Sequence, residues 1–154
     1  MQSLFENWRR FITEAAVSYS GILKALPSSK VVSEIQSLEL PEGAVMLPPE
    51  KLHVTLVHQS ILKPYRKEIK SMEFPEAPEP KLVRTADGAV ELQEAVDDPK
   101  RSWVVFLENQ EEMRAYVNQV MESLGAQADP EPERRYHISV ANLTGNPTDS
   151  VRYP

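Results

Sequence analysis

The stretch Leu52-His-Val-Thr-Leu-Val57 decides the fold, because its apolar and polar residues alternate as they do in a half-buried strand. A second stretch with the same alternation, Tyr136-His-Ile-Ser-Val140, lies within a strand predicted over residues 135–143, near the other end of the chain. Successive side chains of a strand point to opposite faces. Each stretch therefore predicts a strand with one polar face and one core face. The residues expected on the core face are Val54, Leu56, Ile138 and Val140.

Two further segments show the three- and four-residue apolar spacing that is typical of an amphipathic helix. The first covers residues 4 to 26, begins with a capping box and ends before Pro27. The second runs between Asn109 and Gly125, which fit the start and the stop of a helix. Both helices are expected to pack their apolar stripe on the core.

Shorter elements fill the space between these segments. The prediction is a short helix at 64–72, a hairpin of strands at 81–84 and 89–93 with its turn at 85–88, and a strand at 103–107. Residues 30 to 40 fit either a strand or a helix. Residues 73 to 81 and 129 to 133 are rich in proline and glutamate, which indicates stiff, solvated connections.

Length and composition favour one ordinary globular unit. A chain of 154 residues with 41% apolar and 26% charged residues is typical of a single soluble domain, so residues 1–154 are expected to form one domain. The net charge of -6 argues against a surface that coats long nucleic acid, since such binding relies on many phosphate contacts. A local basic pocket for a small anion remains compatible with that charge.

The compartment is indicated by what the sequence lacks. It contains no cysteine, which excludes disulfides, thiolate metal sites and a cysteine nucleophile. The first ten residues carry charges where a signal peptide needs an apolar stretch. No apolar run approaches the roughly 20 residues of a membrane span. We therefore expect a cytoplasmic protein that does not contact membranes.

The polar faces of the two strands carry the residues that indicate chemistry. His53 and Thr55 share one face of the first strand, and His137 and Ser139 share one face of the second. Cleavage of a phosphodiester needs a base for the attacking oxygen and an acid for the leaving oxygen, and histidine serves both roles near neutral pH. The hydroxyls can donate hydrogen bonds to the phosphate oxygens. The alternative interpretation is two ordinary strand histidines.

The two histidine motifs and their surroundings resemble a known family of phosphoesterases. The run Leu47-Pro-Pro-Glu-Lys-Leu-His53-Val-Thr-Leu56, together with Tyr136-His-Ile-Ser-Val140, resembles the signature of the two-histidine (2H) phosphoesterases, which include LigT-like RNA ligases and cyclic phosphodiesterases. The tail Asn142-Leu-Thr-Gly-Asn-Pro147 is further similar to phage anti-CBASS phosphodiesterases, which destroy the cyclic di- and trinucleotides of a bacterial antiviral defence.

The resemblance implies a fold, a mechanism and a location. The fold would be two-lobed and α+β, with antiparallel sheets lining a central groove and helices outside. His53 and His137 would be the catalytic pair and Thr55 and Ser139 the phosphate-binding hydroxyls, with no metal and no cofactor. The substrate would be a small cyclic oligonucleotide cleaved at a 3'-5' linkage. If the gene is phage-encoded, the protein would act in the host cell cytoplasm.

Further residues are candidates for substrate binding. Arg135 lies two residues before His137, so in a strand both side chains point to the same face. Arg135 is therefore preferred to Arg134 as a phosphate ligand. Tyr19, Tyr136 and Trp103 could stack on bases, although the parity of Tyr136 and the apolar surroundings of Trp103 favour the core. By parity His58 belongs on the face opposite His53, as a structural or exposed residue.

Three functions remain open on the sequence. The first is a metal-independent phosphodiesterase that acts on cyclic oligonucleotides. The second keeps the chemistry but acts on RNA ends or 2',3'-cyclic phosphates. The third is a non-enzymatic module that sequesters a nucleotide, which would not require two histidines.

Overall fold

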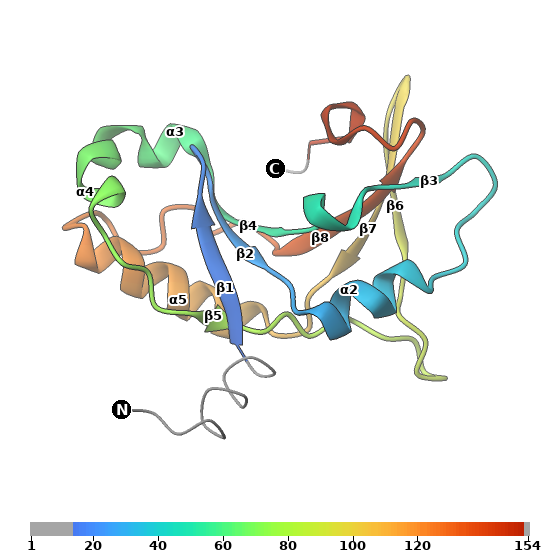
Figure 1. Cartoon of the computed structure of the whole chain (residues 1–154), viewed down its shortest axis with the longest axis horizontal. Coiled ribbons are helices and arrows are strands. Elements are labelled where there is room, and N and C mark those ends of the chain that lie inside the picture. The colour runs from blue at the N-terminus through green and yellow to red at the C-terminus, as the bar shows by residue number, and fades with distance from the viewer. Residues whose placement is uncertain (1–13, 153–154) are drawn as a thin grey trace.

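The computed structural model describes residues 14–152 and shows a mixed α+β fold built on one open antiparallel sheet of eight strands (Figure 1). The strands are β1 (Glu14–Tyr19), β2 (Leu23–Leu26), β3 (Val45–Met46), β4 (Val54–Val57), β5 (Ala77–Pro78), β6 (Gln93–Asp97), β7 (Lys100–Phe106) and β8 (His137–Asn142). The helices are α2 (Ser29–Gln36), α3 (Gln59–Leu62), α4 (Arg66–Lys70) and α5 (Gln110–Ser123), with 3-10 turns at Pro49–Lys51, Lys63–Tyr65 and Pro147–Asp149.

The order of elements repeats along the chain. A hairpin, a helix, a loop and a strand follow one another as β1, β2, α2 and β4, and again as β6, β7, α5 and β8. The sheet runs β5-β1-β2-β4-β8-β7-β6, with β3 also paired to β8, so the two repeats lie in mirrored order. They meet where Val54 pairs with Ile138 in antiparallel β4 and β8. Equivalent strands of the two repeats are therefore neighbours at the centre of the sheet.

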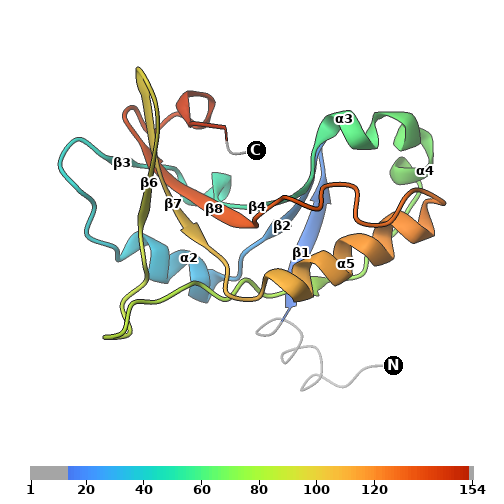
Figure 2. The same cartoon turned by 180° about the vertical axis from the view of Figure 1, so that it is seen from behind.

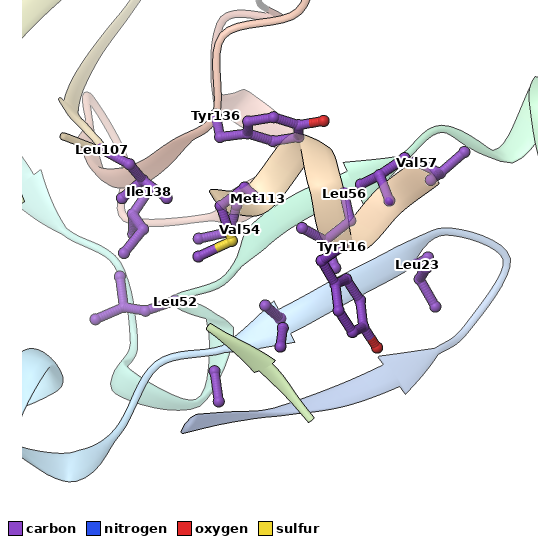
Figure 3. Packing of buried hydrophobic residues seen from close by; sticks show 14 of the residues in the cluster. Leu23, Leu52, Val54, Leu56, Val57, Leu107, Met113, Tyr116, Tyr136 and Ile138 are labelled. Atoms are coloured by element: carbon purple, nitrogen blue, oxygen red, sulfur yellow. The ribbon is translucent and has the colours of Figure 1, made fainter. Parts of the chain in front are cut away.

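The core lies between this sheet and the two longer helices. Figures 1 and 2 show α2 and α5 on one side of the sheet, and α3 and the C-terminal segment on the other. Met113 and Tyr116 of α5 are buried in the same cluster as Val54, Leu56 and Ile138 (Figure 3). The predicted core faces of β4 and β8 are thereby confirmed, because Val54, Leu56, Ile138 and Val140 are all buried.

The predicted helix over residues 4 to 26 is wrong wherever the structure describes it. Residues 14 to 26 form the hairpin β1–β2, and residues 4 to 13 lie outside the described part. Gly21 has a positive φ of 90° and the Ser20 N–H donates to the Ile22 carbonyl at 3.1 Å, which closes a tight turn. Hairpin pairing and the pairing of β2 with β4 outweigh the helical spacing.

Two of the remaining predicted elements are confirmed, and two differ from the prediction. The helix between Asn109 and Gly125 is confirmed as α5, and α4 lies within the predicted helix at 64–72. Residues 73 to 81 are not wholly solvated, because Ala77 is buried and β5 pairs with β1. The turn at 85–88 is present, but its flanking strands are reduced to single bridges at Leu82 and Arg84. Between residues 14 and 152, no helix combines the length and the apolar character needed to cross a bilayer.

Candidate active site

A cavity of about 750 Å³ opens beside the β4–β8 junction. Its walls come from these two strands, from the start of α3 and from the C-terminal segment. The lining residues are Ile22, Leu47, Lys51, His53, Thr55, His58, Gln59, Ser60, Arg134, His137, Ser139, Pro147, Thr148, Ser150, Val151 and Arg152. A volume of this size lies within the range of small-molecule binding pockets.

The antiparallel register brings the four polar strand residues together. When the Val54–Ile138 pairing is extended by one residue in each direction, His53 lies opposite Ser139 and Thr55 lies opposite His137. The two histidines are then diagonal neighbours, for which side-chain origins lie about 7 to 8 Å apart. That separation lets two imidazoles flank one phosphate group, with a hydroxyl next to each.

Both imidazoles are oriented by the same local hydrogen bond. His53 Nδ1 lies 2.8 Å from the Lys51 carbonyl oxygen, and His137 Nδ1 lies 2.9 Å from the Arg135 carbonyl oxygen. A carbonyl oxygen only accepts, so Nδ1 carries the proton in each neutral ring and Nε2 carries the lone pair. Nε2 is therefore the atom through which each ring can exchange a proton with a ligand.

The surroundings favour neutral imidazoles. Burial lowers the pKa of His53 below its usual 6.5, and the positive charges of Lys24 and Arg134 lower it further, against the hydrogen bond to Lys51. Burial is also the main cause that lowers the pKa of His137, and Arg134, His53 and Arg135 add to the effect. An anionic ligand between the rings would oppose these shifts, because it favours the charged imidazolium.

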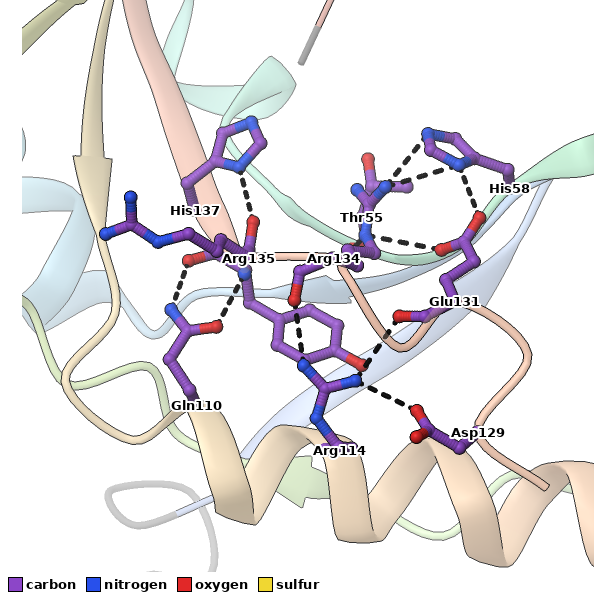
Figure 4. Close-up of polar contacts among 10 residues, drawn as sticks. Thr55, His58, Gln110, Arg114, Asp129, Glu131, Arg134, Arg135 and His137 are labelled. Atoms are coloured by element: carbon purple, nitrogen blue, oxygen red, sulfur yellow. Dashed lines mark hydrogen bonds and ion pairs between the residues drawn. The ribbon is translucent and has the colours of Figure 1, made fainter. Parts of the chain in front are cut away.

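The segments before the two histidines are rigid for identifiable reasons. Pro48 and Pro49 start a 3-10 turn in which the Lys51 N–H donates to the Pro48 carbonyl at 2.9 Å. This turn fixes the carbonyl that orients His53. Before β8, the Gln110 side chain bonds both the N–H and the carbonyl of Tyr136, each at 2.7 Å (Figure 4). The amide clamp fixes the backbone immediately before His137.

The structure does not bring the four residues predicted to bind substrate into this cavity. Tyr136 and Trp103 are only 2% and 4% exposed and belong to the core, and Tyr19 packs partly buried against it. Arg135 is exposed, and its guanidinium carbon lies 4.0 Å from the centre of the Phe106 ring. None of the four is among the residues that line the cavity.

Arg134 and His58 line the cavity, although alternation along the strands assigned both of them to other positions. The side chains of Arg134 and Arg135 point in opposite directions (Figure 4), and Arg134 lines the cavity. Strand parity failed here because β8 begins only at His137 and β4 ends at Val57. His58 occupies the position before α3 without a side-chain capping bond, and it lines the cavity as well. Both residues lie outside the strands, so alternation along a strand does not predict where their side chains point.

The identity of a ligand must be inferred from these residues alone. Within residues 14–152, no three His, Cys, Asp or Glu side chains gather in a group that could hold a metal ion. Comparisons of the chain with protein-family models, curated proteins and solved structures found no significant match.

Proposed function

We propose that this protein is a metal-independent phosphodiesterase of the two-histidine class that cleaves 3'-5' linkages in cyclic di- or trinucleotides. The observation that carries the proposal is the β4–β8 junction, where His53, Thr55, His137 and Ser139 line one cavity. The mirrored order of the two repeats supports the two-lobed arrangement expected of that class. The likeness of residues 142–147 to the anti-CBASS phosphodiesterases supports the choice of substrate.

In the proposed step, one imidazole acts as base and the other as acid. Nε2 of the base removes the proton of a substrate ribose 2'-OH, and the 2'-oxygen forms a bond to the adjacent phosphorus. The bond from phosphorus to the 5'-oxygen breaks, and the second imidazole, protonated at Nε2, gives its proton to that oxygen. The product is a linear nucleotide that ends in a 2',3'-cyclic phosphate. Neither water nor a metal ion is consumed or required in this step.

The two hydroxyls act on the charge that grows during the step. Thr55 and Ser139 stand beside the histidines and can donate hydrogen bonds to the non-bridging phosphate oxygens. Fixed donors aimed at developing charge stabilise a transition state more than they stabilise the ground state. Acid and base groups each typically contribute about 10²- to 10⁴-fold in rate. In a phage-infected cell, such an enzyme would act in the host cytoplasm and remove an immune signal.

The test is a panel of substrates in EDTA. Purified protein is incubated with cyclic di- and trinucleotides, and the products are separated by chromatography. We expect linear products that end in a 2',3'-cyclic phosphate, and no turnover by the double variant His53→Ala/His137→Ala. Cyclic substrates that stay intact after long incubation would contradict the proposed substrate.

The same panel separates the other two functions. Turnover of a terminal 2',3'-cyclic phosphate, with cyclic oligonucleotides untouched, would indicate an enzyme of RNA ends. Binding of a cyclic oligonucleotide without turnover, and with unchanged affinity in the double variant, would indicate a sequestering module.

A further inference from the structure

We propose that Arg134 is the phosphate-binding cation of this cavity and that Glu131 and His58 are positioning residues that hold its guanidinium. The proposal rests on the function proposed above and adds three residues to it. None of them belongs to the repeated histidine-apolar-hydroxyl pattern. All three are brought together by the loop that precedes β8.

Arg134 is a buried residue in the loop before β8. It is 5% exposed, yet it lines the cavity that also contains both histidines. Its Nε donates to the Thr55 carbonyl at 3.1 Å, which ties the loop before β8 to the middle of β4. Its hydrogen bonds within residues 14–152 are made through Nε and Nη1. A buried guanidinium with unused donors that borders a cavity is suited to bind an anion there.

Glu131 and His58 surround the other side of this guanidinium (Figure 4). Glu131 Oε1 lies 2.5 Å from His58 Nδ1, and Arg134 Nη1 lies 3.0 Å from His58 Nε2. Glu131 Oε2 is buried, makes no hydrogen bond within the described part of the chain, and lies 3.6 Å from Arg134 Nε. The carboxylate compensates the buried positive charge without occupying all of its donors.

The charge of Arg134 acts on both reacting rings. Arg134 lines the same cavity as His53 and His137, and its positive charge lowers the pKa of both rings. A phosphate between the two imidazoles would therefore also lie near the guanidinium. In the transition state the non-bridging oxygens gain negative charge, and a fixed cation beside them lowers the barrier.

Variants of Arg134 test the proposal against a matched change at an exposed arginine far from the histidines. Arg134→Gln is expected to lower kcat about 10²- to 10³-fold, as the loss of one transition-state donor does elsewhere. Arg134→Lys keeps the charge but loses the planar fork, so we expect a loss of about tenfold. Arg66→Gln, at an exposed position of α4 outside the cavity, should stay within about threefold of the wild type. Equal losses for Arg134→Gln and Arg66→Gln would overturn the assignment.

A titration by NMR separates this role from a purely structural one. Removal of the cation in Arg134→Gln should raise the pKa of both His53 and His137, since a nearby positive charge disfavours the imidazolium. Inorganic phosphate should shift the resonances of both rings in the wild type, with a weaker affinity in Arg134→Gln. If Arg134→Gln does not fold, the same two measurements are made on Arg134→Lys and Glu131→Gln, both of which should weaken phosphate binding. Unchanged phosphate affinity in a folded variant would overturn the proposal.

The combined results distinguish the proposed role of Arg134 from the proposed phosphodiesterase reaction. If the wild type cleaves its substrate, the histidine variants do not, and Arg134→Gln keeps full activity, the role of Arg134 is wrong and the phosphodiesterase stands. If the wild type cleaves nothing but phosphate binding depends on Arg134, the anion site stands and the proposed reaction is wrong.

Discussion

The two candidate catalytic histidines occupy equivalent local settings. His53 immediately precedes β4 and His137 begins β8, and each Nδ1 donates to the carbonyl two residues earlier. This bond fixes both the tautomer and the ring orientation before any ligand arrives, so little side-chain freedom is lost on binding. The equivalence is a consequence of the repeat, since His53 and His137 hold the same position in it.

Removal of either ring should abolish most of the activity. We expect His53→Ala and His137→Ala each to cost roughly 3 to 5 kcal/mol of transition-state stabilisation, measured as kcat/KM on the best substrate of the panel. The double variant should be little worse than either single one, because acid and base act as a unit. Strictly additive losses would show that the two rings act independently.

The pKa shifts predict the pH dependence of the rate. The reactive form has one neutral and one protonated imidazole, so kcat/KM should be bell-shaped in pH. Both pKa values are lowered from 6.5 in the free protein, so the maximum of kcat/KM should lie below pH 6.5. The bound phosphodiester anion raises both values, so kcat should peak at a higher pH than kcat/KM. A flat profile from pH 5 to 8 would remove the acid-base assignment.

At the scale of elements, the C-terminal segment, residues 143–152, contributes one wall of the cavity. Its anchor is the buried Asn142 at the end of β8, whose Oδ1 accepts from the N–H groups of Thr144 and Gly145 at 3.0 and 2.6 Å. Its Nδ2 donates to the Asn146 carbonyl at 2.6 Å and to Ser150 Oγ at 3.0 Å. A single side chain thus fixes the start and the end of the segment.

Loss of this anchor should loosen the wall without unfolding the sheet. Asn142→Ala removes four hydrogen bonds made by a fully buried side chain, so we expect the free energy of unfolding to fall by about 2 to 3 kcal/mol. Amide hydrogen exchange should speed up at Thr144 and Gly145 more than in β7. Leu143→Ala, at an exposed neighbouring position, is the control and should leave exchange at these two amides unchanged. Unchanged exchange in Asn142→Ala would show that the segment is held by other contacts.

At the scale of the whole molecule, the two repeats share one core across the β4–β8 junction. Ile138 is fully buried at this junction and pairs with Val54, while α5 of the second repeat contacts β4 of the first. Neither repeat can therefore bury its apolar face alone. This arrangement favours one cooperative unit over two independent lobes.

Unfolding experiments test that cooperativity. Ile138→Ala should lower the free energy of unfolding by about 2 to 5 kcal/mol, since it leaves a cavity at the centre of the core. Circular dichroism and the NMR signals of His53 and His137 should report one coincident transition in wild type and variant. Val96→Ala, at an exposed position of β6, is the control and should change stability by less than about 0.5 kcal/mol. Two separate transitions would show that the repeats fold as independent units.

Local sequence patterns by themselves determined much of the secondary structure of this protein and which strand faces are buried. Alternation identified β4 and β8 and the face that each turns to the core, and apolar spacing between Asn109 and Gly125 delimited α5, because these features depend on the near neighbours of each residue. The same patterns misassigned residues 14–26. The apolar spacing of these residues fits a helix, but they form a hairpin because β2 pairs with β4 in the sheet.

Only the tertiary structure decided which residues meet at the candidate site. Arg134, Glu131 and His58 lie in loops, where the direction of a side chain follows from packing and not from parity. The antiparallel register of β4 and β8 likewise places His53 beside Ser139, although these residues are far apart in sequence. Contacts of this kind depend on how distant segments pack, and that information is spread over the whole chain.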